Sequence, residues 1–169
     1  MTTIAYDGTT IAWDTHMTDK YGVRSQCAFD KVTVDKGRIF AAAGNIDSCF
    51  CAVQWIKKGA KLKDWDKIMP PGADFEMVVI DLKKGPVYYS DSDRTGIPLE
   101  APLAIGSGAD FALGAIAAGM SASEAVGIAT KFDVYTGINV KVMNVHDALV
   151  VKPAPKPRRA KKRSRVRAR

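Results

Sequence analysis

Thr2 could act as both a nucleophile and a base once Met1 is removed, which is expected when a small residue follows the initiator methionine. Removal of Met1 leaves a free α-amino group, whose ordinary pKa of about 7.7–8 lets it accept a proton near neutral pH. The threonine hydroxyl then has a base within its own residue, which is one of the ways in which nucleophiles are activated. This chemistry needs a rigid terminus and a nearby cation that favours the neutral amine and the alkoxide.

Asp14 and Lys31 are available as the acid and the cation of such a site. Asp14 ends the second of two β-branched runs, and Lys31 begins the next predicted strand, 17 residues further on. Lys31 would lower the pKa of the Thr2 hydroxyl, and Asp14 would orient Lys31. The alternative is an ordinary solvated ion pair, which is the commoner state of such residues at strand ends.

The elements that must position these residues are mainly strands. Two β-branched runs flank Asp7-Gly8, which predicts a hairpin whose two turn residues both have positive φ. The first strand would therefore begin at the very N-terminus and hold it in place. Further strands are predicted at 31–34, 38–44, 76–82, 87–91 and 102–108, and one or two more at 134–145.

Three helices are predicted between these strands. The first runs over 46–58 with Asn45 as its cap, and Phe50, Val53 and Ile56 would share its apolar face. The others run over 109–118 and from a capping box that begins at Ser121. Residues 60–75 are interpreted as a surface connection. This order of elements predicts an α+β layered domain.

Composition separates a globular domain over 1–151 from a basic tail over 152–169. The chain has a net charge of +7, but the tail holds ten Lys/Arg and no acidic residue, which leaves residues 1–151 at −3. We expect the tail to be disordered and to bind polyanions such as nucleic acid, or merely to aid solubility. The three cysteines, the absence of a signal peptide and the absence of a membrane-spanning run favour the reducing cytoplasm.

Several apparent motifs do not meet the requirements of their chemistry. Gly106-Ser-Gly108 lacks the third glycine of a dinucleotide-binding loop, and the calcium-loop-like segment 91–96 lacks the required glutamate. Cys49 and Cys51 lie two residues apart on a predicted helix, so they cannot share a metal. His16 and His146 have no partner at ligand spacing, and we interpret both as structural or exposed.

Five short motifs in register resemble the family of HslV and the proteasome β subunits, whose members are N-terminal threonine peptidases. They are the opening TTIAYDGTTIAWD, then Lys31-Val32, the segment 41–45 (AAAGN), IGSG at 105–108, and DVYTG at 133–137. The match runs in order through residues 2–145. The chain departs from the family at Asn45, at Thr130-Lys131 and in the shorter first turn, and nothing in the family corresponds to the basic tail.

The resemblance implies roles for further residues. Thr2 would be the nucleophile, with Lys31 and Asp14 as above, and the backbone N–H near Gly44 would form the oxyanion hole. Ser107, Asp133 and Thr136 would hydrogen-bond around the amine and relay its proton. For Ser107 the alternative is a helix cap, and for Asp133 a turn residue. The resemblance also implies a possible sodium ion, held at the loop positions Thr130, Asp133 and Thr136.

The resemblance further implies a four-layer α-β-β-α sandwich of the N-terminal nucleophile (Ntn) hydrolase type. Its function would be that of a threonine-type endopeptidase acting on peptides or proteins, with no required cofactor. It would form a self-compartmentalised homo-oligomeric ring, and an ATPase unfoldase could be its partner. Two alternatives remain: a small-amide amidohydrolase on the same fold, and an inactive member that binds nucleic acid or serves a structural role through its tail.

Overall fold

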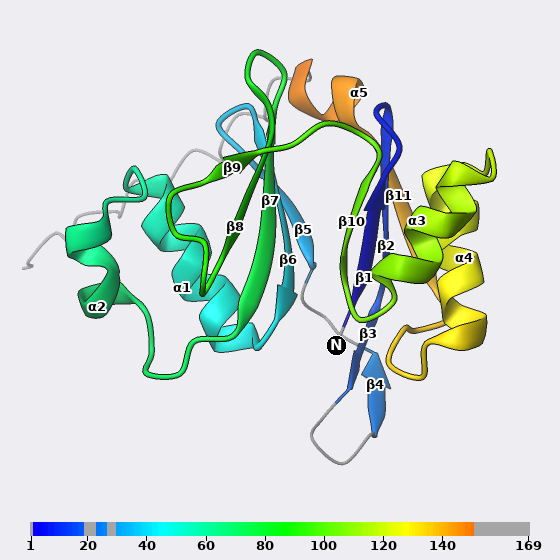
Figure 1. Cartoon of the computed structure of the whole chain (residues 1–169), viewed down its shortest axis with the longest axis horizontal. Helices are drawn as coiled ribbons and strands as arrows, with labels where there is room; N and C mark the ends of the chain where they lie inside the picture. Colours follow the sequence, from blue (N-terminus) through cyan, green and yellow to red (C-terminus); the bar gives the residue numbers. More distant parts are fainter. Residues whose placement is uncertain (1, 19–22, 27–29, 151–169) are drawn as a thin grey trace, which may run out of the picture.

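The computed structural model describes residues 2–18, 23–26 and 30–150. Two antiparallel sheets face each other, and helices lie against the outer side of each (Figure 1). The sequence therefore predicted the α+β class correctly. The basic tail and Cys27 lie outside the described residues, so the expectations about them are not addressed by the structure.

The first sheet has four strands in the order β10-β1-β2-β11, so the strand that follows Thr2 is central in it. Its members are β1 (Thr3–Tyr6), β2 (Thr10–Asp14), β10 (Leu103–Gly106) and β11 (Val140–Asn144). The predicted hairpin is present, but among its described turn residues only Gly8 has a positive φ. Asp7 needs none, because its carboxylate accepts the N–H groups of Thr9 and Thr10 and closes the turn.

The second sheet has five strands in the order β5-β6-β7-β8-β9. They are β5 (Val32–Asp35), β6 (Arg38–Gly44), β7 (Phe75–Asp81), β8 (Gly85–Ser90) and β9 (Ile97–Pro98). All but β9 lie within two residues of the predicted ranges. A separate two-stranded ribbon of β3 (His16–Thr18) and β4 (Arg24–Gln26) was not predicted.

The helices α1 (Ile46–Lys57), α3 (Ala109–Ala117) and α4 (Ala122–Phe132) match the predicted ones. Asn45 caps α1, and Ser121 and Glu124 form the predicted capping box. The predicted apolar face of α1 was partly wrong: Ile56 is buried and Val53 packs against the same cluster, but Phe50 is 46% exposed. The buried face contains Ser48, Cys49, Ala52, Trp55 and Ile56. The stripe is therefore centred on Ala52 and Trp55 and leaves Phe50 at its edge.

The interpretation of 60–75 as a surface connection was partly wrong. A 3-10 turn (Leu62–Asp64) and the short helix α2 (Trp65–Ile68) lie there. Trp65 is buried and packs edge-on against Trp55, at 5.0 Å between ring centroids. Sequence periodicity could not indicate this, because a single aromatic side chain in a polar segment holds the helix against the core.

The C-terminal part of the domain also differs from expectation. Within 134–145 only β11 is a strand, and the six-residue helix α5 (Val145–Val150), which was not predicted, follows it directly. Residues 133–139 instead form the loop that returns from α4. None of the helices in the described part of the chain combines the length and hydropathy that spanning a bilayer requires.

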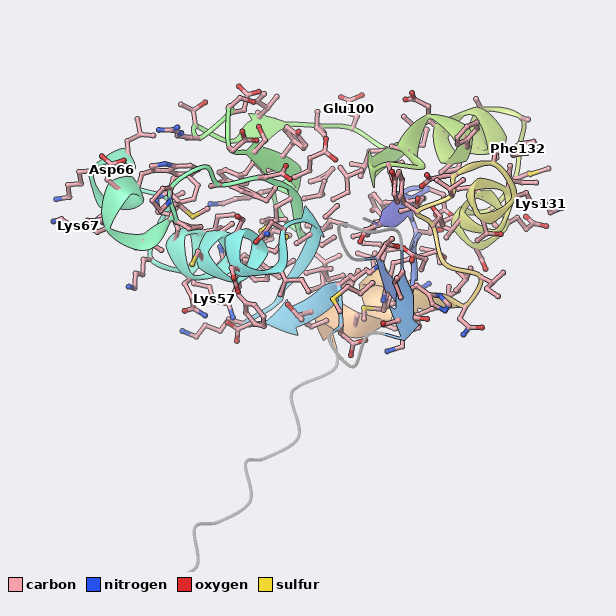
Figure 2. The ribbon with its side chains drawn as sticks, turned by 90° about the horizontal axis from the view of Figure 1, so that it is seen from below. Lys57, Asp66, Lys67, Glu100, Lys131 and Phe132 are labelled. Carbon is pink, nitrogen blue, oxygen red and sulfur yellow. The ribbon has the colours of Figure 1, made fainter. Side chains whose placement is uncertain are left out.

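The strands bury side chains on both faces, which accounts for the three apolar clusters. Ile4 of β1 and Ile39 of β6 point into the cluster between the sheets. Their neighbours Ala5 and Phe40 point the other way, toward α3 and α4 and toward α1 and α2, respectively. Figure 2 shows Lys67 of α2 and Lys131 of α4 at opposite ends of the molecule. The two sheets are thus covered on their outer sides and pack on each other at the centre.

Substituting Trp55 tests the corrected helix face. Trp55→Ala should lower the free energy of unfolding by about 3–5 kcal/mol, because it empties a fully buried site. Phe50→Ala is the matched control and should cost roughly 1 kcal/mol or less, since much of that ring is already in water. Urea unfolding followed by circular dichroism measures both. Losses of equal size would contradict the observed face.

Candidate active site

The carboxylate of Asp14 lies at the centre of the site and is fully buried. Its Oδ1 accepts the N–H of Thr3 and the ammonium of Lys31, each at 2.9 Å. Its Oδ2 accepts the N–H of Gly137 at 2.9 Å and the N–H of His16 at 3.2 Å. Lys31 is itself only 8% exposed. The solvated ion pair considered from the sequence is therefore wrong, and the pair is buried.

Thr2 immediately precedes β1 and is only 5% exposed. The strand positions it, because Thr3 pairs with Gly106 of β10 and donates its N–H to Asp14. Gly106 has a φ of +91°, and a Cβ at that position would lie 1.9 Å from the carbonyl oxygen of Thr2. Any other residue at 106 would therefore displace Thr2.

A chain of hydroxyl and carboxylate groups runs behind Thr2. Ser107 Oγ donates to Asp133 Oδ2 at 2.6 Å, and Thr136 Oγ1 donates to the same oxygen at 2.5 Å. Thr136 Oγ1 also lies 2.5 Å from Thr3 Oγ1. Gly108 makes this meeting possible, since its Cβ would lie 2.2 Å from Thr3 Oγ1. The structure thus brings together Ser107, Asp133 and Thr136, as the resemblance implied.

The alternative roles were a helix cap for Ser107 and a turn residue for Asp133, and the structure supports only the second. Gly108, and not Ser107, is the N-cap of α3, and it makes no side-chain cap hydrogen bond. A capping role for Ser107 was therefore wrong. Asp133 does close a turn, since its Oδ1 accepts the N–H of Tyr135 at 3.1 Å. The turn and the contacts of Oδ2 use different oxygens of one carboxylate.

These donors also set the charge of Asp133. Burial by itself would raise the pKa of this carboxyl, but the hydrogen bonds from Ser107, Thr136 and the N–H of Tyr135 outweigh burial and lower the pKa below its ordinary range. Asp133 is therefore a carboxylate at neutral pH. Its negative charge lies next to a serine hydroxyl at the mouth of the site.

A pocket of about 150 Å³ opens at Thr2. It is lined by Thr2, Ala43, Gly44, Asp74, Glu76, Gly106 and Ser107. Gly44 has a φ of +119°, and a Cβ there would lie 2.6 Å from the carbonyl oxygen of Asp74, so only glycine fits. Asp74 and Glu76 were not singled out from the sequence. Asp74 lies just before β7 and Glu76 is its second residue, and only the pairing of β7 with β6 brings them to the end of β1.

The two described cysteines do not line this pocket. Cys49 and Cys51 are free thiols, and burial raises the pKa of Cys49 to about 12, so its thiol is protonated and inert at neutral pH. In the described ranges no three His, Cys, Asp or Glu side chains gather as a metal site. A larger hollow is lined by Trp65, Pro70, Arg94 and neighbours, but it contains none of the residues predicted for the site.

The predicted sodium positions offer only oxygen donors, the type that hard cations prefer. Thr130 Oγ1 is turned back to the carbonyl of Gly127 at 2.8 Å, and the Asp133 carboxylate is used by Ser107, Thr136 and Tyr135. Main-chain carbonyls are therefore the groups that would hold a cation here. The donor type fits, and no step of the chemistry proposed below depends on the ion.

The arrangement combines the parts that acyl transfer requires. Thr2, a buried residue with a hydroxyl, stands at the start of a fixed strand and lines a pocket. The buried ammonium of Lys31 is held by the carboxylate of Asp14, which also accepts the N–H of Thr3, the residue after Thr2. Backbone groups at a glycine that tolerates no side chain line the same pocket. A second carboxylate with two hydroxyl donors lies beside it.

The lowered pKa of Asp133 predicts a defined acid sensitivity. A carboxyl whose folded pKa is depressed contributes stability above its unfolded pKa, near 4, and loses it as pH falls through the folded pKa. Asp133→Asn should therefore be less stable than wild type at pH 6.5 but closer to it at pH 3. Urea unfolding at both pH values measures this, with the exposed Asp91→Asn as control. A gap that stays constant with pH would contradict the assignment.

Comparison with known proteins agrees with the motifs in the sequence. No protein-family model and no curated protein matches the chain. Among solved structures, HslV from Trypanosoma brucei is 19% identical with a TM-score of 0.62, covering 85% of this chain and 98% of that one. BPH from Thiobacillus denitrificans, in complex with epoxomicin, is 18% identical with a TM-score of 0.63 and covers 85% and 98%. A second BPH structure is 21% identical, with a TM-score of 0.59 and coverage of 85% and 97%. The chain therefore has the fold of HslV and BPH, which is the fold that its sequence motifs predicted.

Proposed function

We propose that this protein is a threonine-type endopeptidase that cleaves peptide bonds through an ester on Thr2. The observation that carries the proposal is the position of Thr2, which lies buried at the end of a central strand and lines a pocket. The buried Lys31–Asp14 pair is tied to the next residue of that strand. The likeness in fold to HslV, and to a BPH structure that holds epoxomicin, supports the same chemistry.

The reaction would proceed in two balanced steps. The α-amine of Thr2 takes the hydroxyl proton as Oγ1 bonds to the scissile carbonyl carbon, and the C–N bond then breaks as that proton passes to the leaving amine. Water next attacks the ester, the Thr2 amine again accepts a proton, and the acid product leaves with the hydroxyl restored. Lys31 would favour the alkoxide, and a backbone N–H near Gly44 would stabilise the oxyanion.

Ser107, Asp133 and Thr136 would act on the amine. Their hydrogen-bond chain ends at Ser107, which lines the pocket with Thr2. Because Asp133 is ionised, it can only accept hydrogen bonds, so the hydroxyl of Ser107 must donate to it. This fixes the direction of every hydrogen bond from Ser107 to Asp133. We assign these three residues to positioning the amine and relaying its proton. A sodium ion at the carbonyls of the α4–β11 loop would rigidify the same segment.

The layering supports an Ntn hydrolase sandwich. Side chains of the strands alternate between the central cluster and the helix-facing clusters, as four layers require. We propose the same assembly for this chain as for its family, a homo-oligomeric ring in the cytoplasm, with an ATPase unfoldase as a possible partner. An exposed apolar pair, Phe111 stacked on Phe132 at 5.6 Å between ring centroids, is the type of surface that a subunit contact covers.

The alternatives predict different substrates. A small-amide amidohydrolase would use the same Thr2 chemistry but would fail on peptides. The inactive, tail-dependent alternative has less support, because a copy without catalysis would not need Thr2 buried at a pocket or Lys31 held by Asp14. Binding of nucleic acid by residues 152–169 is a separate proposal and does not depend on the peptidase.

Thr2→Ala should reduce the hydrolysis of fluorogenic peptides at least about a thousandfold, since nucleophile and base act as one unit. The fold should persist, because the Thr2 side chain makes no hydrogen bond to any described residue. Lys31→Ala should cause a comparable loss, whereas Lys57→Ala, which removes the exposed pair with Asp35, should not. Wild-type turnover by Thr2→Ala would exclude the threonine mechanism.

The same experiment has a covalent readout. Epoxomicin, a peptide epoxyketone, should add to Thr2, and intact mass should show that Met1 has been lost beforehand. Peptide mapping locates the adduct. An adduct on another residue, or an active protein that retains Met1, would contradict the proposed nucleophile.

The ring is tested by molecular mass in solution. We expect light scattering to give a fixed multiple of 18.3 kDa, because closed symmetry is the usual form of soluble homo-oligomers. Phe132→Ser should weaken the assembly, since it removes the more exposed ring of the apolar pair. A monomer of wild-type protein throughout the micromolar range would exclude the ring and leave the chemistry of Thr2 to be judged by the peptide assay.

A further inference from the structure

We propose that the pocket at Thr2 selects peptides with a positively charged group next to the scissile bond, and that Asp74 and Glu76 provide this selectivity. The inference rests on the proposed peptidase function and adds a substrate class to it. Of the residues that line the pocket, these two are the only ones with ionisable side chains, and both are acidic. The same pocket contains Thr2, which is 95% buried and has no side-chain hydrogen bond within the described residues.

Glu76 is fixed in orientation by two donors. Its Oε2 accepts the N–H of Gly106 at 2.7 Å, and its Oε1 accepts the hydroxyl of Tyr88 at 3.3 Å. Gly106 in turn packs on the carbonyl of Thr2, so the carboxylate is held close to the proposed nucleophile. An ionised carboxylate has about four acceptor positions, so two remain for a ligand. No cation among the described residues pairs with Glu76.

Asp74 is held through its backbone and leaves its side chain for a ligand. Its N–H donates to Ser48 Oγ at 3.2 Å, and its carbonyl accepts the N–H of Asn45 at 2.9 Å. Its side chain is exposed, and its carboxylate has no hydrogen bond or ion pair within the described part of the chain. The loop before β7 thus presents this charge from a fixed position at the rim of the pocket.

The charged groups around the pocket sum to a negative charge. Lys31 is the nearby buried cation, and Asp14 already balances it. Burial and then the charge of Glu76 raise the pKa of Tyr88. The surroundings of Thr2 therefore carry an excess of negative charge, which raises the local concentration of cationic ligands.

The size of the pocket limits what the cation can be. About 150 Å³ matches a cavity that admits one benzene-sized group, well below the 300–1,000 Å³ typical of drug-sized ligands. A single Lys or Arg side chain fits this limit, and so does the α-ammonium of a short peptide. Both offer the same chemistry, a donor-rich cation for two carboxylates. The first source would give cleavage within chains, and the second would give cleavage near free N-termini.

Matched peptides test the selectivity. A single Arg is moved through the positions on either side of the scissile bond in end-blocked fluorogenic peptides, and each is compared with its citrulline twin, which has the same shape but no charge. At one position, kcat/KM should be at least about tenfold higher for Arg than for citrulline, as expected for charge-assisted hydrogen bonds. A second series with free N-termini distinguishes the α-ammonium source.

Variants assign the effect to the two carboxylates. Asp74→Asn and Glu76→Gln keep the shapes of the side chains, and the amide oxygen introduced by Glu76→Gln would still accept the N–H of Gly106. The Arg-to-citrulline ratio should fall to within about twofold in the double variant, and part of the way in Asp74→Asn alone. The ratio cancels any general loss of activity. Asp91→Asn, an exposed carboxylate at the other hollow, should keep the wild-type ratio.

Each result distinguishes the inference from the function on which it rests. Cleavage of all peptides with a ratio near one in both the blocked and the free series would overturn the inference and leave the peptidase intact. An Arg-to-citrulline ratio that stays at the wild-type value in Asp74→Asn and in the double variant would show that other groups bind the positive charge. That result would also overturn the inference. Absence of cleavage of every peptide, by a protein that has lost Met1, would overturn the proposed function itself.

Discussion

The buried carboxylate of Asp14 is the constraint on which the site depends. A charge removed from water must be compensated, and here three backbone N–H groups and the Lys31 ammonium do so. These donors come from the start of β1, from β3, from the residue before β5 and from the loop after α4. The carboxylate thus joins both sheets and the α4–β11 loop at one point. Removing the ammonium would leave an uncompensated charge at a cost of roughly 3–5 kcal/mol.

Much of the fold could be predicted because its signals are local. Large and small apolar residues alternate at Ile4, Ala5 and Tyr6, because this strand is buried on both faces. The caps Asn45 and Ser121 mark helix starts, because the first N–H groups of a helix need an acceptor outside it. Thr2, Asp14 and Lys31 could be chosen because the chemistry demands those types of residue. Gly44, Ser107, Asp133 and Thr136 came from the resemblance alone, since their roles depend on contacts between distant segments.

What the sequence did not reveal has the same physical cause. Trp65 holds α2 to the core through a contact with Trp55, and no periodicity in a four-residue helix indicates such a contact. Phe50 was wrongly placed on the buried face of α1, because an apolar side chain alone does not tell which side of a helix meets the sheet: Ala52 and Trp55 are buried there, while Phe50 is half in water. Asp74 and Glu76 appear as ordinary polar residues around a strand start until strand pairing places them beside Thr2.

The pairing of β1 with β10 has a consequence for the order of events during synthesis. Thr3 pairs with Gly106, so the first strand waits for a partner that leaves the ribosome about one hundred residues later. At 5–20 residues per second, the start of the chain stays accessible for roughly 5 to 20 seconds. In the folded chain Thr2 is 95% buried. The pairing that fixes the residue after Thr2 is thus completed only when Gly106 has left the ribosome, long after Asp14 and Lys31, so the site is assembled late in synthesis.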